Sequence, residues 1–268
     1  MHHREPPIQV DIHTHVLPGI DDGARDIEQA LAMLRVAAAD GTQIVVATPH
    51  ARRTDVAQVV AAVERLQEAI GRQSLPLQLA SGMEEQLWPD LVDRLLVGTA
   101  LTLCGTRWVL VELPDWTVWP SDLTDRLLEL RAAGFRPILA HVERYGPIQR
   151  QPERLLEAIA TGALIQVNAD SLFGQNGYAA QQVALRLIRA GAVSVLASDA
   201  HHPEWRAPRL RPAFERLAAL FGEEVVSRLQ ANAVAVVRDQ DVASPSPDPD
   251  MLSTSMTLLE RVRAWVGF

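Results

Sequence analysis

Short apolar runs alternate with helical patterns along most of this chain, and this alternation is the feature that most constrains its fold. Residues 44–47 (IVVA) form one such run, continuous in the way typical of a strand buried on both faces. Between the runs, apolar residues recur at spacings of three and four, which predicts amphipathic helices. Strands that alternate with helices form right-handed βαβ units and a largely parallel sheet. About seven units follow one another without a linker, so we expect a single barrel-like α/β domain.

The expected elements extend from residue 11 to the end of the seventh strand. The expected strands are 11–15, 44–47, 77–80, 108–111, 137–140, 164–167 and 193–197, and the expected helices are 27–40, 55–70, 122–133, 155–160 and 179–190. Asp26 is expected to cap the first helix, and Gly41 is expected to end it. We assign residues 1–240 to the barrel.

The end of the chain differs in composition. Residues 241–250 are rich in proline, serine and aspartate, which predicts a solvated, stiff linker. Residues 251–268 carry a helical apolar stripe, which predicts a C-terminal amphipathic helix docked on its own barrel or on a neighbouring subunit. A helix that docks on another partner or on a membrane surface is the alternative, although only Arg261 and Arg263 are basic there.

Charge and cysteine content restrict the class of protein. A net charge of −8 argues against a general nucleic-acid binder, because neutralising phosphates needs a basic face, but it leaves room for one local phosphate site. The single cysteine, Cys104, cannot form an internal disulfide or a cysteine zinc site, so a reducing cytoplasm is the expected localisation. The sequence begins without the apolar region of a signal peptide, and no apolar run is long enough to cross a membrane.

The segment Asp11-Ile12-His13-Thr14-His15 is a candidate metal half-site. Side chains two apart on a strand point to the same face, so Asp11, His13 and His15 are expected to project together. Two converging imidazoles can share one ion, while Asp11 is a candidate for the carboxylate that fixes a ring tautomer from behind.

Further polar side chains fall where apolar strands end. They are His50, Glu84, Glu112, His141, Asp199 and His201. In a parallel barrel those ends share one face, which is where active sites lie. Each residue alone has a structural explanation; for example, Glu112 could be half of an ion pair, and His202 is expected to be structural or solvent-facing. Together, however, so many imidazoles and carboxylates need cations to offset their repulsion. Nitrogen and oxygen ligands without thiolate suit Mn2+, iron or zinc, and their number suggests about two or three ions.

The ordered motifs resemble a known superfamily. DIHTH, LPGIDDG, ATPH, GME, VELP, AHVERY and SDAH are similar to the PHP (polymerase and histidinol phosphatase) superfamily. Within it they most resemble the bacterial tyrosine-protein phosphatases of capsule and exopolysaccharide loci, the CpsB/YwqE type. The resemblance runs from about residue 11 to 237, and it implies a distorted (βα)7 TIM-like PHP barrel with a manganese cluster. It says nothing about the C-terminal extension.

The resemblance also implies roles for individual residues. His13 and His15 would bind one metal with Asp199, and Glu112 and Glu84 would bridge or share metals. His50, His141 and His201 would complete the other sites, with Asp22 near the cluster. Arg144 would bind phosphate. Because Glu84 is followed by Glu85, the glutamate that acts as ligand is left open.

The implied reaction is hydrolysis of a phosphate monoester by a metal-activated water. Arg144 offers a planar fork to two phosphoryl oxygens, which a lysine could not match. A tyrosyl leaving group, with a phenol pKa of about 10, needs little help from a general acid, for which Asp22 and His201 are both candidates. Cys104 is not followed by the Cys-x5-Arg loop of thiol phosphatases, so it is a poor nucleophile candidate.

The expected partner is a phosphotyrosine protein, in particular a bacterial tyrosine autokinase, and the protein could form oligomers. One alternative keeps the scaffold and changes the substrate to histidinol phosphate or another small phosphomonoester. A second is a non-catalytic, metal-containing regulatory module. A metal-dependent amidohydrolase with a carboxylated lysine is excluded, because the chain contains no lysine.

Overall fold

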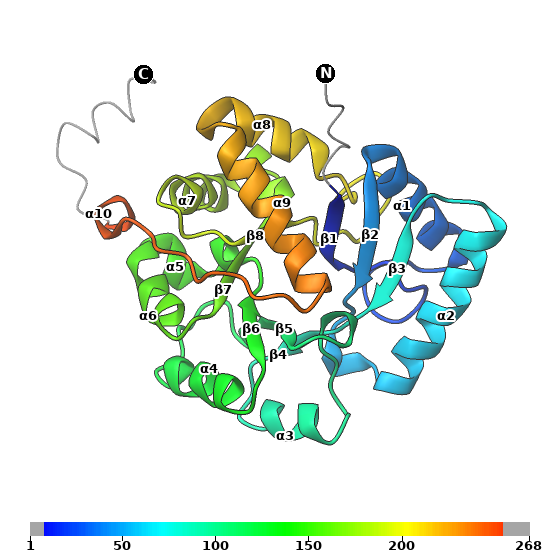
Figure 1. Cartoon of the computed structure of the whole chain (residues 1–268), viewed down its shortest axis with the longest axis horizontal. Helices are drawn as coiled ribbons and strands as arrows, with labels where there is room; N and C mark the ends of the chain where they lie inside the picture. The colour runs from blue at the N-terminus through cyan, green and yellow to red at the C-terminus, as the bar shows by residue number, and fades with distance from the viewer. Residues whose placement is uncertain (1–7, 254–268) are drawn as a thin grey trace.

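Within residues 8–253, which the computed structural model describes, eight parallel strands form the centre of the molecule (Figure 1). They are β1 (Gln9–Thr14), β2 (Thr42–Ala47), β3 (Gln78–Ser81), β4 (Glu84–Gln86), β5 (Trp108–Glu112), β6 (Arg136–Leu139), β7 (Leu164–Asn168) and β8 (Val195–Ala197). The α-helices of this part of the chain are α1 (Ile27–Asp40), α2 (Val56–Arg72), α3 (Leu91–Leu96), α4 (Leu123–Ala132), α5 (Gly146–Arg150), α6 (Leu155–Ala160), α7 (Tyr178–Arg189), α8 (Arg211–Phe221), α9 (Glu223–Val237) and α10 (Pro249–Leu252). Asp26 and Gly41 cap α1 as predicted.

Hydrogen bonds arrange the strands in order as a ring. β1, β2 and β3 pair in sequence, and β4 to β8 do the same. Only two residues separate β3 from β4, and His50, just after β2, makes a bridge to Glu84, so β3 and β4 are successive parts of one bent strand. On the other side, the backbone N–H of His15 donates to the carbonyl of Ala200, 2.8 Å away, and joins β1 to the segment after β8. The ring therefore has seven strand positions, which confirms the predicted distorted barrel.

Gly82 makes the bend between β3 and β4 possible. A Cβ atom at this position would lie 2.9 Å from a methyl group of Leu103 and 3.2 Å from one of Val46. A side chain would therefore push the bent strand away from the barrel interior.

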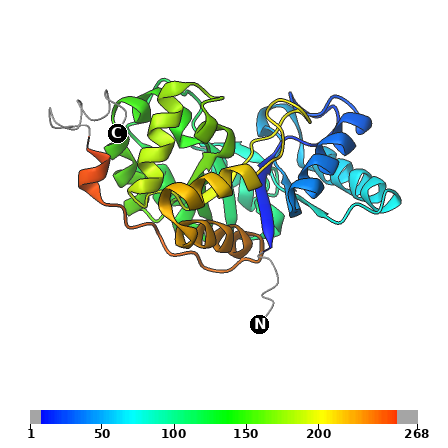
Figure 2. The same cartoon turned by 90° about the horizontal axis from the view of Figure 1, so that it is seen from above.

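Apolar side chains fill the barrel, and one helix covers the end at which the strands begin. The interior cluster includes Ile12, Val46, Leu110, Ile138, Leu164 and Val195, all of them buried. Ala233 and Val236 of α9 join this cluster, and Figure 2 shows α9 lying across the end of the barrel where β1 begins. Because α9 seals the amino-terminal ends of the strands, the open face is the one at their carboxyl ends. Helices α8 and α9 were not among the elements expected from the sequence.

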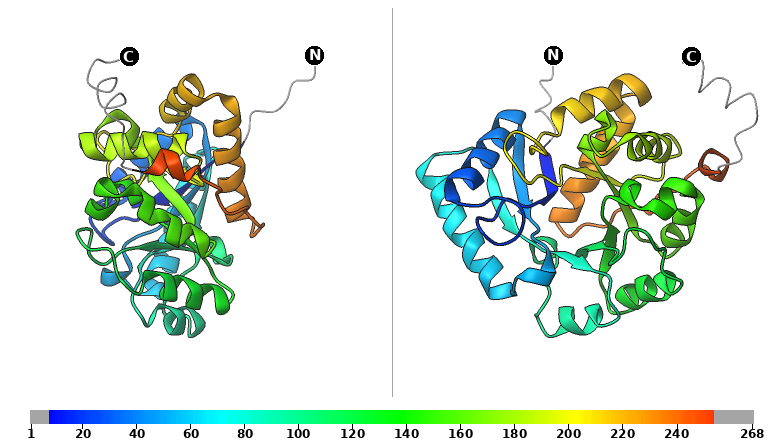
Figure 3. Two further views of the ribbon diagram at one scale, coloured as in Figure 1. Left: turned by 90° about the vertical axis from the view of Figure 1, so that its left-hand side faces the viewer. Right: turned by 180° about the vertical axis from the view of Figure 1, so that it is seen from behind.

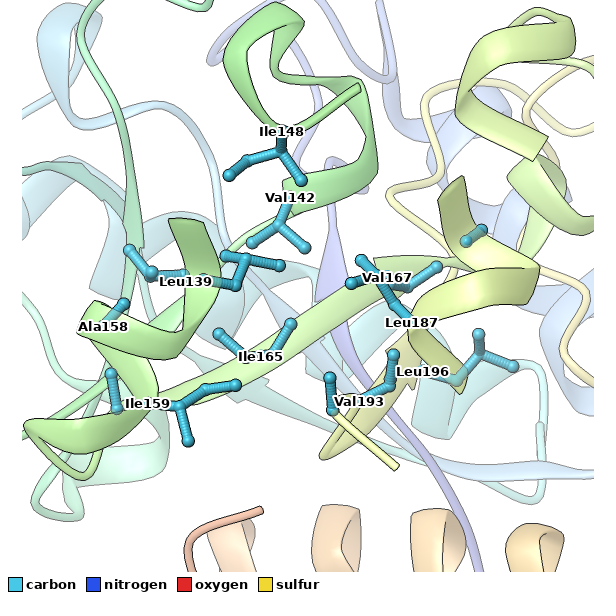
Figure 4. Packing of buried hydrophobic residues seen from close by; sticks show 14 of the residues in the cluster. Leu139, Val142, Ile148, Ala158, Ile159, Ile165, Val167, Leu187, Val193 and Leu196 are labelled. Atoms are coloured by element: carbon cyan, nitrogen blue, oxygen red, sulfur yellow. The ribbon is translucent and has the colours of Figure 1, made fainter. Parts of the chain in front are cut away.

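A second apolar layer joins the strands to the outer helices. Figure 4 shows Leu139, Ile165 and Leu196 of β6, β7 and β8 packed against Ile159 of α6 and Leu187 of α7. Burying side chains of this size contributes about 1.5–3 kcal/mol each. These strands are thus covered on both faces, which explains why they appear in the sequence as continuous apolar runs.

The described part of the C-terminal segment lies against the barrel. The backbone N–H of Asp248 donates to the carbonyl of Ala190, and Leu252 in α10 is fully buried in the outer apolar layer. The predicted C-terminal helix over 251–268 lies almost wholly outside the described residues, and the division into barrel, linker and helix stays a prediction. Among residues 8–253, no helix is long and apolar enough to cross a membrane.

Candidate metal centre

The side chains predicted as metal ligands come together at the carboxyl ends of the strands, on the face turned toward the viewer in the right-hand view of Figure 3. Three overlapping groups have ligand atoms within 4.8 Å of one another: His15, Asp22, His50 and His201; His13, His15 and Glu84; and His50, Glu84 and Glu112. His141 and Asp199 lie against these groups, with His141 Nε2 2.7 Å from Glu84 and Asp199 Oδ1 3.4 Å from His15 Nε2. All eight predicted ligands, together with Asp22, therefore face one another.

An irregularity in β1 lies where the first two histidines converge. Asp11 pairs with Val45 and Thr14 with Ala47, so β1 carries one extra residue over this stretch. Such a bulge redirects neighbouring side chains. Nε2 of His13 lies 3.3 Å from Nε2 of His15, and both rings are fully buried.

Asp11 does not orient the ring of His13 or His15, contrary to the prediction. Its Oδ1 accepts hydrogen bonds from the backbone N–H groups of Ser198 and His13, at 3.1 and 3.4 Å. Asp11 thus ties β1 to the strand that closes the barrel, and burial raises its pKa to about 6. The hypothesis that Asp11 orients a histidine ring is wrong, because other residues hold the rings.

Three histidines have Nδ1 placed against an oxygen acceptor. Nδ1 of His15 lies 2.6 Å from Oδ2 of Asp21, Nδ1 of His13 lies 3.1 Å from Oε1 of Gln166, and Nδ1 of His201 lies 2.8 Å from the carbonyl oxygen of Asp199. A ring that donates from Nδ1 has its Nε2 lone pair available for a metal. In each case Nε2 faces the cluster, so the tautomer with the proton on Nδ1 would suit metal binding.

Gly23 allows Asp21 to reach His15. A Cβ on Gly23 would collide with the carbonyl oxygen of His15, and the N–H of Gly23 donates to Asp21 Oδ1 over 3.0 Å. The DDG motif therefore combines a carboxylate behind the cluster, Asp21, with one at its edge, Asp22. The sequence analysis gave a role only to Asp22.

Glu84 lies at the middle of the histidines. Its Oε1 is 2.7 Å from His141 Nε2, and its Oε2 is 2.9 Å from His50 Nδ1. Glu85 points away and forms an ion pair with Arg94 over 3.0 Å. Of the two adjacent glutamates, Glu84 is therefore the one inside the cluster. Burial opposes its ionisation, but the charges of His13 and His141 hold its pKa well below the usual range.

The carboxylates of the cluster favour positive charge on the groups between them. Burial lowers the pKa of His15, but hydrogen bonds to Asp199 and Asp21 outweigh it and raise that pKa to about 10. Burial and the neighbouring Glu84 raise the pKa of Glu112. Nδ1 of His141 is buried and has no hydrogen-bond partner in the part of the chain that the structure describes. The donor set, entirely nitrogen and oxygen, fits divalent metal ions.

Asp199 joins this cluster to two arginines. Its Oδ1 faces the histidines, whereas its Oδ2 accepts hydrogen bonds of 2.8 Å from Arg144, Arg206 and Asn168. Arg144 also stacks on the ring of Trp116, with Cζ 4.3 Å from the ring centroid. Two guanidinium groups beside one edge of a metal cluster can bind the oxygens of a phosphoryl group.

Sequence analysis missed four residues of this arrangement: Asp21, Gln166, Asn168 and Arg206. Gln166 and Asn168 form a hydrogen-bonded pair on β7, where Gln166 Nε2 donates to Asn168 Oδ1 over 2.8 Å. Polar residues at alternate positions of an otherwise apolar strand were the signal available for these two. Arg206 had no comparable signal, since it lies in a loop after the SDAH motif.

Comparison with known proteins identifies the family. Residues 9–238 match the family described as capsular polysaccharide synthesis, CpsB/CapC. The chain belongs to the CpsB/CapC family. This membership confirms the resemblance stated from the motifs. The tyrosine-protein phosphatase YwqE of Bacillus subtilis is 31% identical over 244 residues, which are 90% of this chain and 96% of YwqE.

Solved structures agree with this membership. A crystal structure from a study of YwqE from Bacillus subtilis and CpsB from Streptococcus pneumoniae, described as unique metal-dependent tyrosine phosphatases, matches with a TM-score of 0.85 at 30% identity. The match covers 89% of this chain and 99% of that one. An amidohydrolase from Mycoplasma synoviae matches with a TM-score of 0.55 at 12% identity, over 96% of this chain and 94% of its own, and shares the fold alone.

Proposed function

We propose that this CpsB/CapC family member is a metal-dependent phosphomonoester hydrolase that acts on phosphotyrosine in proteins. The observation that carries the proposal is the position of Asp199, which faces the histidine cluster with one oxygen and two arginines with the other. A phosphoryl group held by those arginines would lie beside the metal ligands. The tyrosine phosphatases YwqE and CpsB among the relatives support this reading.

The proposed metal ligands are the eight residues that face one another in the cluster: His13, His15, His50, Glu84, Glu112, His141, Asp199 and His201. Asp22 is added at the rim, where it completes the group with His15, His50 and His201. We propose Mn2+ as the resident metal, with iron or zinc as alternatives. When bound, divalent ions at such a cluster polarise phosphoryl oxygens and lower the pKa of a water molecule.

The chain's own residues bind and orient the substrate. Arg144 and Arg206 offer N–H donors to two phosphoryl oxygens, and Asp199 fixes both guanidinium groups through its Oδ2. Trp116 covers one face of Arg144 and limits its movement.

The surroundings of Asp22 and His201 limit the ability of each to act as the general acid. The neighbouring His201 holds the pKa of Asp22 below its usual range, so Asp22 is ionised at neutral pH and is a poor proton donor. Nε2 of His201 lies 3.6 Å from that carboxylate. Burial and the nearby charge of His15 lower the pKa of His201, and its Nε2 faces the metal cluster, so His201 is a poor proton donor as well. We propose that the phenolate leaves without a side-chain general acid, since its conjugate acid has a pKa of about 10.

We propose a bacterial tyrosine autokinase of capsule or exopolysaccharide synthesis as the protein substrate, and the cytoplasm as the compartment. Turnover of a phosphotyrosyl peptide and of histidinol phosphate by the Mn2+-loaded protein tests the substrate class. A higher kcat/KM for the peptide supports a tyrosine phosphatase. A higher value for histidinol phosphate would favour the small-molecule alternative, and no turnover of either would favour a regulatory module.

A further inference from the structure

A short loop beside the metal cluster presents an exposed aromatic side chain. The backbone N–H of His201 donates to the carbonyl of Arg206 over 3.0 Å, which closes the loop 201–206. Trp205 lies within this loop, is 59% exposed, and stacks on His202 with 4.7 Å between ring centroids and 14° between ring planes. The loop therefore carries a proposed metal ligand at one end, a phosphate-binding arginine at the other, and an indole face between them.

A cavity of about 320 Å³ opens next to this loop. It is lined by Asp22, Gly23, Arg25, Gln29, His201, His202 and Trp205. Asp22 and His201 are also members of a candidate metal-binding group, so the cavity is continuous with the cluster. Its volume lies near the lower end of the range for small-ligand pockets, about 300–1,000 Å³.

We infer that this cavity is the subsite for the aromatic ring of the substrate, with Trp205 as its stacking wall. The inference rests on the proposed function, because it takes the phosphoryl group to be bound by Arg144 and Arg206. With the phosphoryl group in that position, the ester oxygen connects it to the aromatic ring, and the ring occupies the cavity that begins at Asp22 and His201. Trp205 is thus a specificity-determining residue, in contact with the substrate.

The Trp205 side of the cavity suits a phenyl ring. Aromatic rings prefer to stack on an indole face, and the stacking of His202 on Trp205 holds the indole in place. Arg25 also lines the cavity and is held by Gln29, whose Oε1 accepts from Arg25 Nε over 3.2 Å. An aliphatic phosphoester would place no flat surface against Trp205. The subsite thus gives a physical reason for a preference for aryl over alkyl phosphates.

Binding of two phosphonates to the Mn2+-loaded protein, measured by calorimetry, tests the subsite without turnover. Phenylphosphonate should bind the wild-type protein about 10-fold more tightly than methylphosphonate. In Trp205→Ala the ratio should fall to about 2, with the Kd for methylphosphonate unchanged, whereas Trp205→Phe should keep most of the preference. Trp205→Ala should also raise KM for a phosphotyrosyl peptide about 10-fold and leave kcat nearly unchanged.

Tyr178→Ala is the matched control, because Tyr178 is an exposed aromatic residue, at 76%, on α7 and lies outside the cavity. It should keep the wild-type ratio. A wild-type protein that binds both phosphonates equally, or a preference that Trp205→Ala leaves intact, would overturn the subsite alone. A wild-type protein that binds neither phosphonate would instead overturn the phosphate site on which the inference rests.

Discussion

Nδ1 of His15 lies 2.6 Å from Oδ2 of Asp21, and the same carboxylate oxygen accepts a hydrogen bond of 3.0 Å from the backbone N–H of His50. The carboxylate of Asp21 lies behind the cluster, and it therefore fixes both the ring of His15 and the backbone that follows β2. Carboxylates in this position set the tautomer and basicity of a metal-binding histidine.

Asp21→Asn is expected to weaken metal binding by about 10- to 100-fold, because an amide cannot match the charge that the carboxylate offers to His15. Competition with a coloured chelator measures the affinity. Asp55→Asn is the control, since Asp55 caps α2 in an exposed position and asparagine caps a helix equally well. An unchanged metal affinity in Asp21→Asn would remove the orienting role.

Arg144→Ala is expected to lower kcat/KM for phosphotyrosyl peptide by about 10²- to 10³-fold, because a charge-assisted, planar donor is lost. Metal content, measured by elemental analysis, should stay at the wild-type level, whereas His13→Ala should lose both metal and rate. Arg144→Lys should recover little activity. The control is Arg72→Ala, since Arg72 is exposed and forms an i,i+4 ion pair with Glu68 on the surface of α2. Full activity in Arg144→Ala would refute the phosphate-binding role.

Gln166→Leu is expected to lower the free energy of unfolding by about 1–3 kcal/mol, because it leaves buried groups unpaired. Gln166 Oε1 lies 3.1 Å from His13 Nδ1 and accepts from the backbone N–H of His141 over 2.9 Å. Urea denaturation followed by circular dichroism measures the change. Gln58→Leu, at an exposed position on α2, should change stability little. Equal stabilities of the Gln166→Leu and Gln58→Leu variants would argue against a stabilising role of the Gln166 hydrogen bonds.

Cys104 is expected to be inert to alkylation at neutral pH. Burial raises the pKa of its thiol to about 11, so the reactive thiolate becomes abundant only as the pH rises toward that value. The rate of reaction with iodoacetamide should increase about tenfold per pH unit between pH 7 and 10. Cys104→Ala should keep full phosphatase activity. Rapid alkylation at pH 7 together with loss of activity would point to a thiol mechanism instead.

The barrel was predictable because most strands, such as β5 and β7, are buried on both faces, whereas the long helices are buried on one. Residues 164–167, for example, are apolar on the side that packs on α7 and polar only at Gln166. The division of the third strand into β3 and β4 could not be predicted from the sequence. Gly82 is needed at the bend because Leu103 packs closely against it, and that contact is not visible in the sequence. Helix α9 was missed, and its packing on the barrel depends on contacts between residues far apart in sequence.

The residues of the candidate site were also predictable only in part. Ligand candidates such as His13 and Glu112 were identifiable because parallel strands place their carboxyl ends together. Residues that act behind them were not, because their role depends on which atom they face: Asp21 and Asp22 are adjacent, yet one supports a ring and the other lies at the rim. Asp11 was misassigned because the bulge in β1 breaks the alternation on which the prediction depended.

The central claim is that these donors bind metal ions that hydrolysis requires. Its most direct test is phosphotyrosyl-peptide hydrolysis by chelator-treated protein, with bound metal counted by elemental analysis before and after Mn2+ is added back. We predict about two to three ions per chain, loss of activity when they are removed, and recovery as Mn2+ rebinds. Activity that persists in metal-free protein, or a folded protein that takes up no metal, would contradict the claim.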